Sequence, residues 1–266
     1  MSWRSAAGAV PFWTACGRHA EAARVCGRFT LTQPARIVAE TFGVDAPPGF
    51  APRWNIAPSQ TAWAVVQAPG EARRRLEARH WGLVPAWVRD PAASPRPINA
   101  RAETAPDKPM FRDAFRHRRC LVPAEGFYEW QARPPSEGGA AAGRRGAGRD
   151  GGKQPFHIRF RDRRPFAIAG LWANWRPAGG GDEKRTFTLL TTQANALVAS
   201  IHDRMPVILP PEAWDLWLDP TLDSRTPLVA LLLPHSDAAM EACPVGQRVN
   251  DARHDGPDCL DQSEPR

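Results

Sequence analysis

Apolar residues in this chain come in short segments separated by turns and by Gly- or Pro-rich connections, and this pattern limits the folds open to it. The run at 228–233 has six apolar residues, far fewer than the roughly 20 that a membrane-spanning helix needs. Segments this short suit β-strands and short helices. We therefore expect a domain without a membrane partner.

The pattern of apolar and polar residues predicts many strands and few helices. Thr32 and Pro34 are expected to begin a first helix, with Thr32 as its cap. Strands are predicted at 61–67, 120–124, 127–130, 156–160, 166–172, 186–191, 205–209 and 244–249. Helices are predicted at 32–42, 195–200, 211–218 and 227–233, and a short basic helix or turn at 110–119. There is no βαβ alternation and no internal repeat, so a single α+β domain is expected.

Two segments do not follow this pattern. Residues 1–25 are mildly apolar but interrupted by Pro11, which makes a poor signal peptide, so we interpret them as a leader that is untranslated or removed. Residues 133–153 are rich in Gly, Ala and Arg without periodicity, and we expect a disordered insert between two strands of a domain at 26–262. Of the net charge of +7, the first segment carries +2 and the second +3.

The cysteines argue against a disulfide scaffold and against a metal centre. Five cysteines in 266 residues are few and odd in number, which favours a reducing cytoplasm. Cys16 and His19 form one pair, but no second Cys/His pair stands at zinc-finger spacing, and Cys120, Cys243 and Cys259 are scattered. No Walker-A or dinucleotide-binding motif is present. We therefore expect no metal and no cofactor.

Four residues are candidates for chemistry, although each alone is more often structural. Cys26 precedes Gly27 and a cation, which suits an exposed position that favours the thiolate. Asn99 can be a turn residue or a cap. Glu129 would share one face of its strand with an apolar neighbour, where a carboxylate needs a partner or a function. His202 precedes an extended run and can serve as a proton carrier.

Eight motifs in a fixed order are far more specific than any single residue. The order closely resembles that of the SOS response-associated peptidase (SRAP) family, the abasic-site processing proteins, and covers residues 26 to about 250. The motifs are VCGRFTL at 25–31, PRWNIAPSQ at 52–60, WGLVPAW at 81–87, INARAET at 98–104, RCLVPAEGFYEW at 119–130, FAIAGLW at 166–172, TLLTTQAN at 188–195 and IHDRMPVIL at 201–209.

The resemblance implies a single domain with a mixed or antiparallel, barrel-like β core and short flanking helices. It also implies a monomer that acts near the nucleoid in the damage response and shields abasic sites in single-stranded DNA, including junctions with duplex. By motif, Cys26 is the nucleophile, supported by Asn99, Glu129 and His202. The implied DNA contacts are Arg28, Arg101, Trp81 and Trp130.

The resemblance further implies that the lesion is shielded by a covalent link to an N-terminal cysteine, and the chemistry explains why the cysteine must be N-terminal. An open abasic sugar presents an aldehyde, which an α-amine attacks to form a Schiff base, and the neighbouring thiol then closes a thiazolidine ring. An internal cysteine has an amide nitrogen whose lone pair is delocalised, so it cannot form this ring. A Schiff base next to a proton acceptor also promotes β-elimination, so weak AP-lyase activity is expected.

The 25 residues before Cys26 conflict with this chemistry, and two explanations resolve the conflict. Translation can start at Val25 through an alternative GTG codon read as Met, whose removal exposes Cys26, and we favour this explanation; alternatively, the leader can be removed by self-cleavage. Two other functions stay open from the sequence. One is a conventional cysteine peptidase acting in trans with Cys26, His202 and Asn99, and the other is a noncovalent module for single-stranded DNA.

Overall fold

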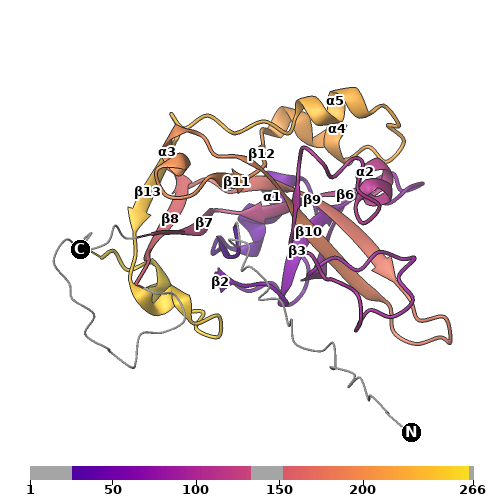
Figure 1. The fold of residues 1–266 in the computed structure, drawn as a ribbon, viewed down its shortest axis with the longest axis horizontal. Coiled ribbons are helices and arrows are strands. Elements are labelled where there is room, and N and C mark those ends of the chain that lie inside the picture. The colour runs from indigo at the N-terminus through magenta and orange to yellow at the C-terminus, as the bar shows by residue number, and fades with distance from the viewer. Residues whose placement is uncertain (1–25, 133–151, 264–266) are drawn as a thin grey trace, which may run out of the picture.

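The computed structural model describes residues 26–132 and 152–263, which form two β-sheets with short helices around them (Figure 1). The predicted leader and residues 133–151 of the predicted insert lie outside this range. The strands are β1 (Phe29–Leu31), β2 (Arg53–Ile56), β3 (Thr61–Val66), β4 (Arg75–Trp81), β5 (Asn99–Arg101), β6 (Arg119–Ala124), β7 (Gly126–Gln131), β8 (Gln154–Phe160), β9 (Phe166–Trp175), β10 (Lys184–Gln193), β11 (Arg204–Pro206), β12 (Ile208–Leu209) and β13 (Met240–Pro244). The α-helices are α1 (Ala35–Phe42), α2 (Arg112–His117), α3 (Ala196–Ala199), α4 (Trp214–Leu218) and α5 (Arg225–Ala230).

Five strands close into a barrel in the order β10, β4, β3, β6 and β9, because β9 pairs back onto β10. Most of these pairs are antiparallel, while β4 and β5 run parallel to β10. Strands dominate and the helices are short, which confirms the predicted α+β class with a barrel-like, mixed core. Among the described helices, none is long and apolar enough to cross a membrane.

A second, antiparallel sheet has the order β13, β8, β7, β1 and β2. The chain passes from the barrel to this sheet between β6 and β7, where Glu125 is the only intervening residue. The Glu125 carboxylate accepts hydrogen bonds from the backbone N–H groups of Thr32 and Gln33, which fixes the chain just before α1. The end of β1 is thereby held at the corner where the two sheets meet.

The sequence predicted the long strands well and the short ones poorly. It missed β1, β2, β4 and β5, because β4 carries several charged residues and the other three have three or four residues each. The predicted cap at Thr32 is wrong, since Pro34 occupies the cap position without a side-chain bond. The predicted last strand at 244–249 is also wrong: β13 ends at Pro244, and a 3-10 helix (Gln247–Asn250) follows.

Arg119 is buried at the start of β6 and connects two helices to the barrel. Its guanidinium donates to the carbonyl oxygens of Phe115 at 2.8 Å and Trp217 at 2.7 Å, and also to those of Arg116 and Asp219. These carbonyls lie in or just after α2 and α4, where the last turn of a helix has no partners of its own. Burial lowers the pKa of Arg119 to about 10, which still leaves it charged at neutral pH.

Replacing Arg119 with leucine is expected to lower the free energy of unfolding by about 3–5 kcal/mol, because two buried and two partly buried carbonyls lose their donor. Urea titration of both variants measures the effect. The matched control is Arg118→Leu, which removes a neighbouring, more exposed arginine paired with Asp113 and should cost less than about 1 kcal/mol. Equal losses of unfolding free energy in the two variants would contradict the proposal that Arg119 stabilises the packing of α2 and α4 on the barrel.

Candidate active site

The pairing of β1 with β7 brings the start of the described chain next to the GFYEW motif. Phe29 lies opposite Phe127, and the backbone N–H of Tyr128 donates to the carbonyl oxygen of Arg28 at 2.9 Å. Glu129 shares the core-facing side of β7 with Phe127, as the alternation predicts, and is 1% exposed. The register therefore places this carboxylate beside Cys26, which lies 103 residues earlier in the chain.

The protein organises the backbone nitrogen of Cys26. This N–H donates to Glu129 Oε1 at 2.5 Å, and the Asn99 side chain donates from Nδ2 to the Cys26 carbonyl oxygen at 3.5 Å. Asn99 is held there because β5 pairs with β10, with Asn99 opposite Leu189. The structure thus brings together three of the four predicted catalytic residues.

Burial changes the proton affinities of these groups. It raises the pKa of Glu129 to about 8, and the negative charge of Asp203 adds to this, while the Cys26 N–H and Lys153 oppose it. Burial also raises the pKa of the Cys26 thiol well above its usual value, with a further contribution from Glu129. Cys26 is fully buried, so the expectation of an exposed position that favours the thiolate is wrong.

His202 lies on the turn between α3 and β11, next to the end of β7. Gln131 donates from Nε2 to the carbonyl oxygen of Ser200 at 2.7 Å, which ties this turn to the strand of Glu129. Burial lowers the pKa of His202, whereas Asp203, whose Oδ1 lies 2.9 Å from Nδ1, opposes the change. Asp203 and Lys153 influence the pKa values of both His202 and Glu129, so the two groups share one electrostatic environment.

Arg28 and Trp130 form a pair on the other face of these strands. The Arg28 guanidinium lies 5.8 Å from the centre of the Trp130 ring and donates to Asn55 Oδ1 at 3.0 Å. It also donates to the carbonyl oxygen of Val249 at 2.5 Å. The Trp130 indole N–H donates to Asn250 Oδ1 at 2.8 Å, so both side chains are held by the segment after β13.

The sequence of this chain matches the model of a known protein family. The model of the family described as "SOS response associated peptidase (SRAP)" matches residues 25–252, most of the chain. The chain belongs to the SRAP family. Its predicted membership is thereby confirmed, and the site lies within the matched region of the SRAP domain.

Curated relatives and a solved structure are similar over nearly the whole SRAP domain. The abasic site processing protein YoqW of Bacillus subtilis is 35% identical over 240 residues, covering 89% of this chain and 99% of YoqW. The abasic site processing protein HMCES of Xenopus tropicalis is 33% identical over 243 residues, covering 79% of this chain and 66% of HMCES. A crystal structure of a Bacteroides thetaiotaomicron protein matches with a TM-score of 0.75 at 26% identity, covering 90% of this chain and all of that one.

The two remaining predicted DNA contacts have different surroundings in this SRAP domain. Arg101 ends β5 two residues after Asn99 and is exposed. Trp81 is fully buried, with its ring packed against Phe29 and Phe187 and its indole N–H bonded to the Ile98 carbonyl oxygen at 2.8 Å. A ring enclosed in this way has no surface left for a base, so Trp81 is a core residue rather than the predicted DNA contact.

Three charged residues near the site are not predicted from the sequence. Lys153 lies in the predicted insert, and Asp203 and Arg204 belong to the IHDRMPVIL motif without a predicted role. Arg204 forms a two-point ion pair with Glu103, at 2.8 and 2.9 Å, which ties the His202 turn to the segment after β5. Asp203 and Arg204 could have been predicted as site residues because they directly follow His202. Lys153 could not, because it follows a Gly-rich stretch without a recognisable pattern.

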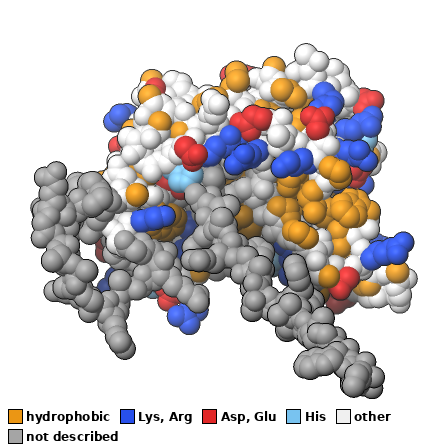
Figure 2. Space-filling model, viewed as in Figure 1, with side chains coloured by type: hydrophobic (Ala, Val, Ile, Leu, Met, Phe, Trp, Pro, Cys, Tyr) orange, Lys and Arg blue, Asp and Glu red, His pale blue; other side chains and the backbone are white. Residues whose placement is uncertain are grey.

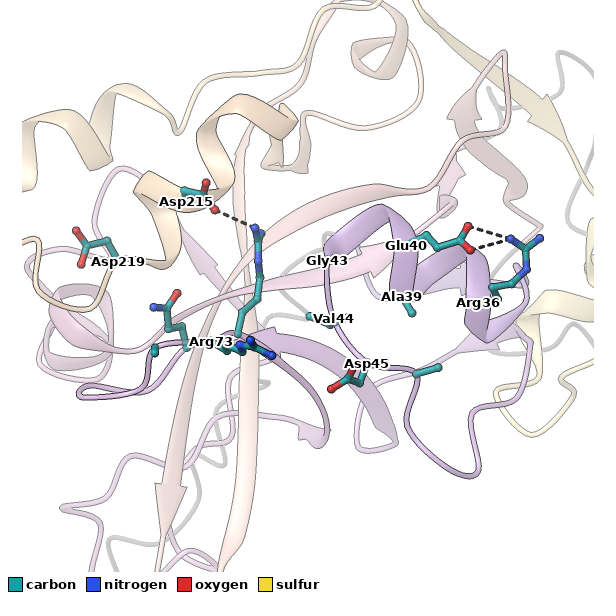
Figure 3. A pocket seen from close by; sticks show the side chains of 13 residues that line it. Arg36, Ala39, Glu40, Gly43, Val44, Asp45, Arg73, Asp215 and Asp219 are labelled. Carbon is teal, nitrogen blue, oxygen red and sulfur yellow. Dashed lines mark hydrogen bonds and ion pairs between the residues drawn. The ribbon is translucent and has the colours of Figure 1, made fainter.

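Neither the pockets nor the charged side chains on the surface identify the candidate active site by themselves. Figure 2 shows Lys and Arg side chains in a broken row across the upper half of one face, mixed with acidic side chains and next to a hydrophobic area. A hollow of 840 Å³ between α1 and α4 is lined by ion-paired residues such as Arg36 and Glu40, and contains none of the predicted site residues (Figure 3). Neither a continuous basic patch nor this hollow therefore coincides with the predicted site residues.

Proposed function

We propose that this protein processes abasic sites in DNA by forming a covalent link between Cys26 and the ring-opened sugar in single-stranded DNA, which shields the lesion. The observation that carries the proposal is the 2.5 Å hydrogen bond from the Cys26 nitrogen to the buried Glu129 carboxylate. A site built for thiol chemistry alone would stabilise the thiolate, but here the thiol pKa is raised. The names of the relatives, abasic site processing proteins, support the same substrate.

The reaction balances with one water released. The Cys26 α-amine adds to the aldehyde carbon and water leaves, which forms the Schiff base with a new C–N bond. The thiol then adds across this C=N bond, so that a C–S bond forms and the thiol proton moves to nitrogen. Glu129 takes up the amine proton and His202 transfers protons during sugar opening, while Asn99 orients the residue.

The same proposal requires that Cys26 becomes the first residue. Cys26 has a φ of +41°, in the left-handed region that costs energy for a residue with a Cβ atom. This torsion exists only while a peptide bond precedes Cys26, so a chain that begins at Cys26 is free of that strain. The amine of Cys26 would be exposed by a start at Val25 followed by removal of the initiator methionine, or by self-cleavage with Cys26 as the nucleophile.

Arg28, Arg101 and Trp130 would hold the DNA next to this site. Arginine guanidinium groups suit phosphate oxygens, and a half-buried tryptophan offers a face on which an unpaired base can stack. Arg28 is two residues from Cys26, Arg101 two from Asn99 and Trp130 adjacent to Glu129. Each contact is therefore tethered by backbone to one of the reacting or orienting groups.

Three single-stranded oligonucleotides test the proposal, using a chain that begins at Cys26. One carries a natural abasic site, one a tetrahydrofuran analogue without the aldehyde, and one is intact. A product that survives boiling in SDS is expected with the natural abasic site alone. Salt-reversible binding to all three would support the noncovalent module instead. Cleavage of an external peptide without any DNA product would support the peptidase.

The matched control for this experiment is the full chain, which keeps residues 1–25 before Cys26. Intact mass measurement first establishes which residue begins each protein. The full chain should form no heat-stable product while its leader is present, because its nitrogen at residue 26 is an amide. An equal yield from a chain that demonstrably begins at Met1 would refute the proposed role of the amine.

A further inference from the structure

The segment after β13 gathers three different metal-binding side chains in one place. The imidazole of His254, the carboxylate of Asp258 and the thiol of Cys259 have ligand atoms that all lie within 4.8 Å of one another. Asp258 Oδ1 lies 2.7 Å from His254 Nε2, and Cys259 is fully buried. Nitrogen, oxygen and sulfur donors together suit a borderline-soft divalent cation such as zinc.

The backbone leaves room for this cluster at Gly256. A Cβ atom at this position would lie 2.8 Å from Asp258 Oδ1 and 3.8 Å from the His254 ring. The φ of Gly256 is −130°, which any residue can adopt, so glycine is needed here for space and not for conformation. The other oxygen of Asp258 lies 2.9 Å from the Arg248 guanidinium, which orients the carboxylate.

Strand β2 and the residues around it hold the same segment in place. The Asp255 carboxylate accepts hydrogen bonds from the backbone N–H groups of Trp54 at 2.6 Å and Asn55 at 2.9 Å. The Asn55 side chain donates to the carbonyl oxygen of His254 at 2.7 Å. Hydrogen bonds from β2 thus hold the backbone that carries the three side chains. The three donor groups are therefore close together before any ion binds.

We propose that His254, Asp258 and Cys259 form a structural binding site for a zinc-type divalent cation. The ion would replace the hydrogen bond between His254 and Asp258 with bonds of about 2.0–2.3 Å to each donor, and water would take a fourth position. The Cys259 thiol loses its proton to solvent on binding. The spacing of the three residues differs from that of paired Cys/His ligands, so the sequence predicts no metal site here.

The location of the site gives it a consequence for the proposed DNA surface. The carbonyl oxygen of Val249 and the side chain of Asn250, which hold Arg28 and Trp130, belong to the same segment. A cation at residues 254–259 would therefore stabilise the segment that positions these two side chains. Metal binding itself does not depend on the chemistry proposed at Cys26, so the two proposals can fail separately.

Cobalt and zinc titrations test the site, using tag-free, metal-free full chain in a Cys16→Ser, Cys26→Ser background that removes the thiol of the Cys16/His19 pair and the candidate nucleophile. Cobalt is expected to give visible bands and thiolate-to-cobalt charge transfer, both lost when zinc displaces it. Cys259→Ser should remove the charge-transfer band. It should also weaken zinc binding by more than the roughly 10–100-fold that the loss of a second-shell partner costs. Cys243→Ser, which changes a partly exposed thiol outside the cluster, is the matched control and should bind as the parent does.

Two outcomes would overturn the proposal: no cobalt spectrum in the parent protein, or the same spectrum and affinity in Cys259→Ser. Asp258→Asn keeps the size of the side chain and serves as a second test in case Cys259→Ser does not fold. It should lose affinity while its circular dichroism stays that of the parent. Zinc should also raise the melting temperature of the parent and of Cys243→Ser, but not that of Asp258→Asn.

Discussion

Replacing Cys26 with alanine, in a chain that begins at residue 26, is expected to abolish the heat-stable product with abasic DNA completely. Alanine keeps the α-amine and so can still form the Schiff base, but it has no thiol to close the ring. Sodium borohydride reduces a Schiff base to a stable amine, so it should trap a product with Cys26→Ala. Denaturing gels with and without borohydride measure both species.

The control for this variant is Cys243→Ser, which removes a partly exposed thiol far from the site in sequence. It should yield as much heat-stable product as the parent, because a thiol without a neighbouring amine cannot close the ring. If Cys26→Ala gave the parent's yield without borohydride, the thiazolidine would not be the product. If borohydride trapped nothing, the amine would not be the attacking group.

Replacing Glu129 with glutamine is expected to slow formation of the product by about 100-fold or more at neutral pH. The glutamine amide fills the same space, so the fold should be kept, but it cannot accept the proton of the α-amine. Burial raises the pKa of Glu129 to about 8, close to the 7.7–8.0 of an α-amine, so proton transfer between the two groups is nearly balanced. Single-turnover rates on abasic oligonucleotide measure the effect.

Glu125→Gln is the matched control, since it changes the other carboxylate of the same β6–β7 corner. Glu125 bonds to the backbone of Thr32 and Gln33 rather than to Cys26. It should therefore affect stability while leaving the rate near that of the parent. Equal rates for the two variants, at equal circular dichroism, would show that Glu129 is only a structural partner of Cys26.

Some of the site could be predicted because its signal is local. Cys26, Asn99 and Glu129 lie in motifs whose residue types and order identify the family, and the strand alternation placed Glu129 on the face of Phe127. Trp81 shows the limit of this reasoning. Its motif is as recognisable as the others, but only the packing of Phe29 and Phe187 around its ring shows that it is a core residue.

The proposed cation site at His254, Asp258 and Cys259 shows a different limit of prediction from sequence. His254, Asp258 and Cys259 are close in sequence, but their spacing matches no familiar metal-binding pattern. Their relation depends on a 3-10 turn (Pro257–Leu260) and on bonds from Asn55, about 200 residues earlier in the chain. The local turn and this long-range anchoring together bring the three donors close to one another.

The sequence by itself determined the family, the class of fold, most of the longer strands and the residue types able to attack an aldehyde. These properties follow from the local order of side chains. The tertiary structure alone decided that Glu129 lies against the nitrogen of Cys26 and that burial raises the pKa values of both side chains. Strand pairing across 103 residues and removal from water are properties of the packed chain, because neither the partner of a strand nor the solvent around a side chain is set by its neighbours in sequence.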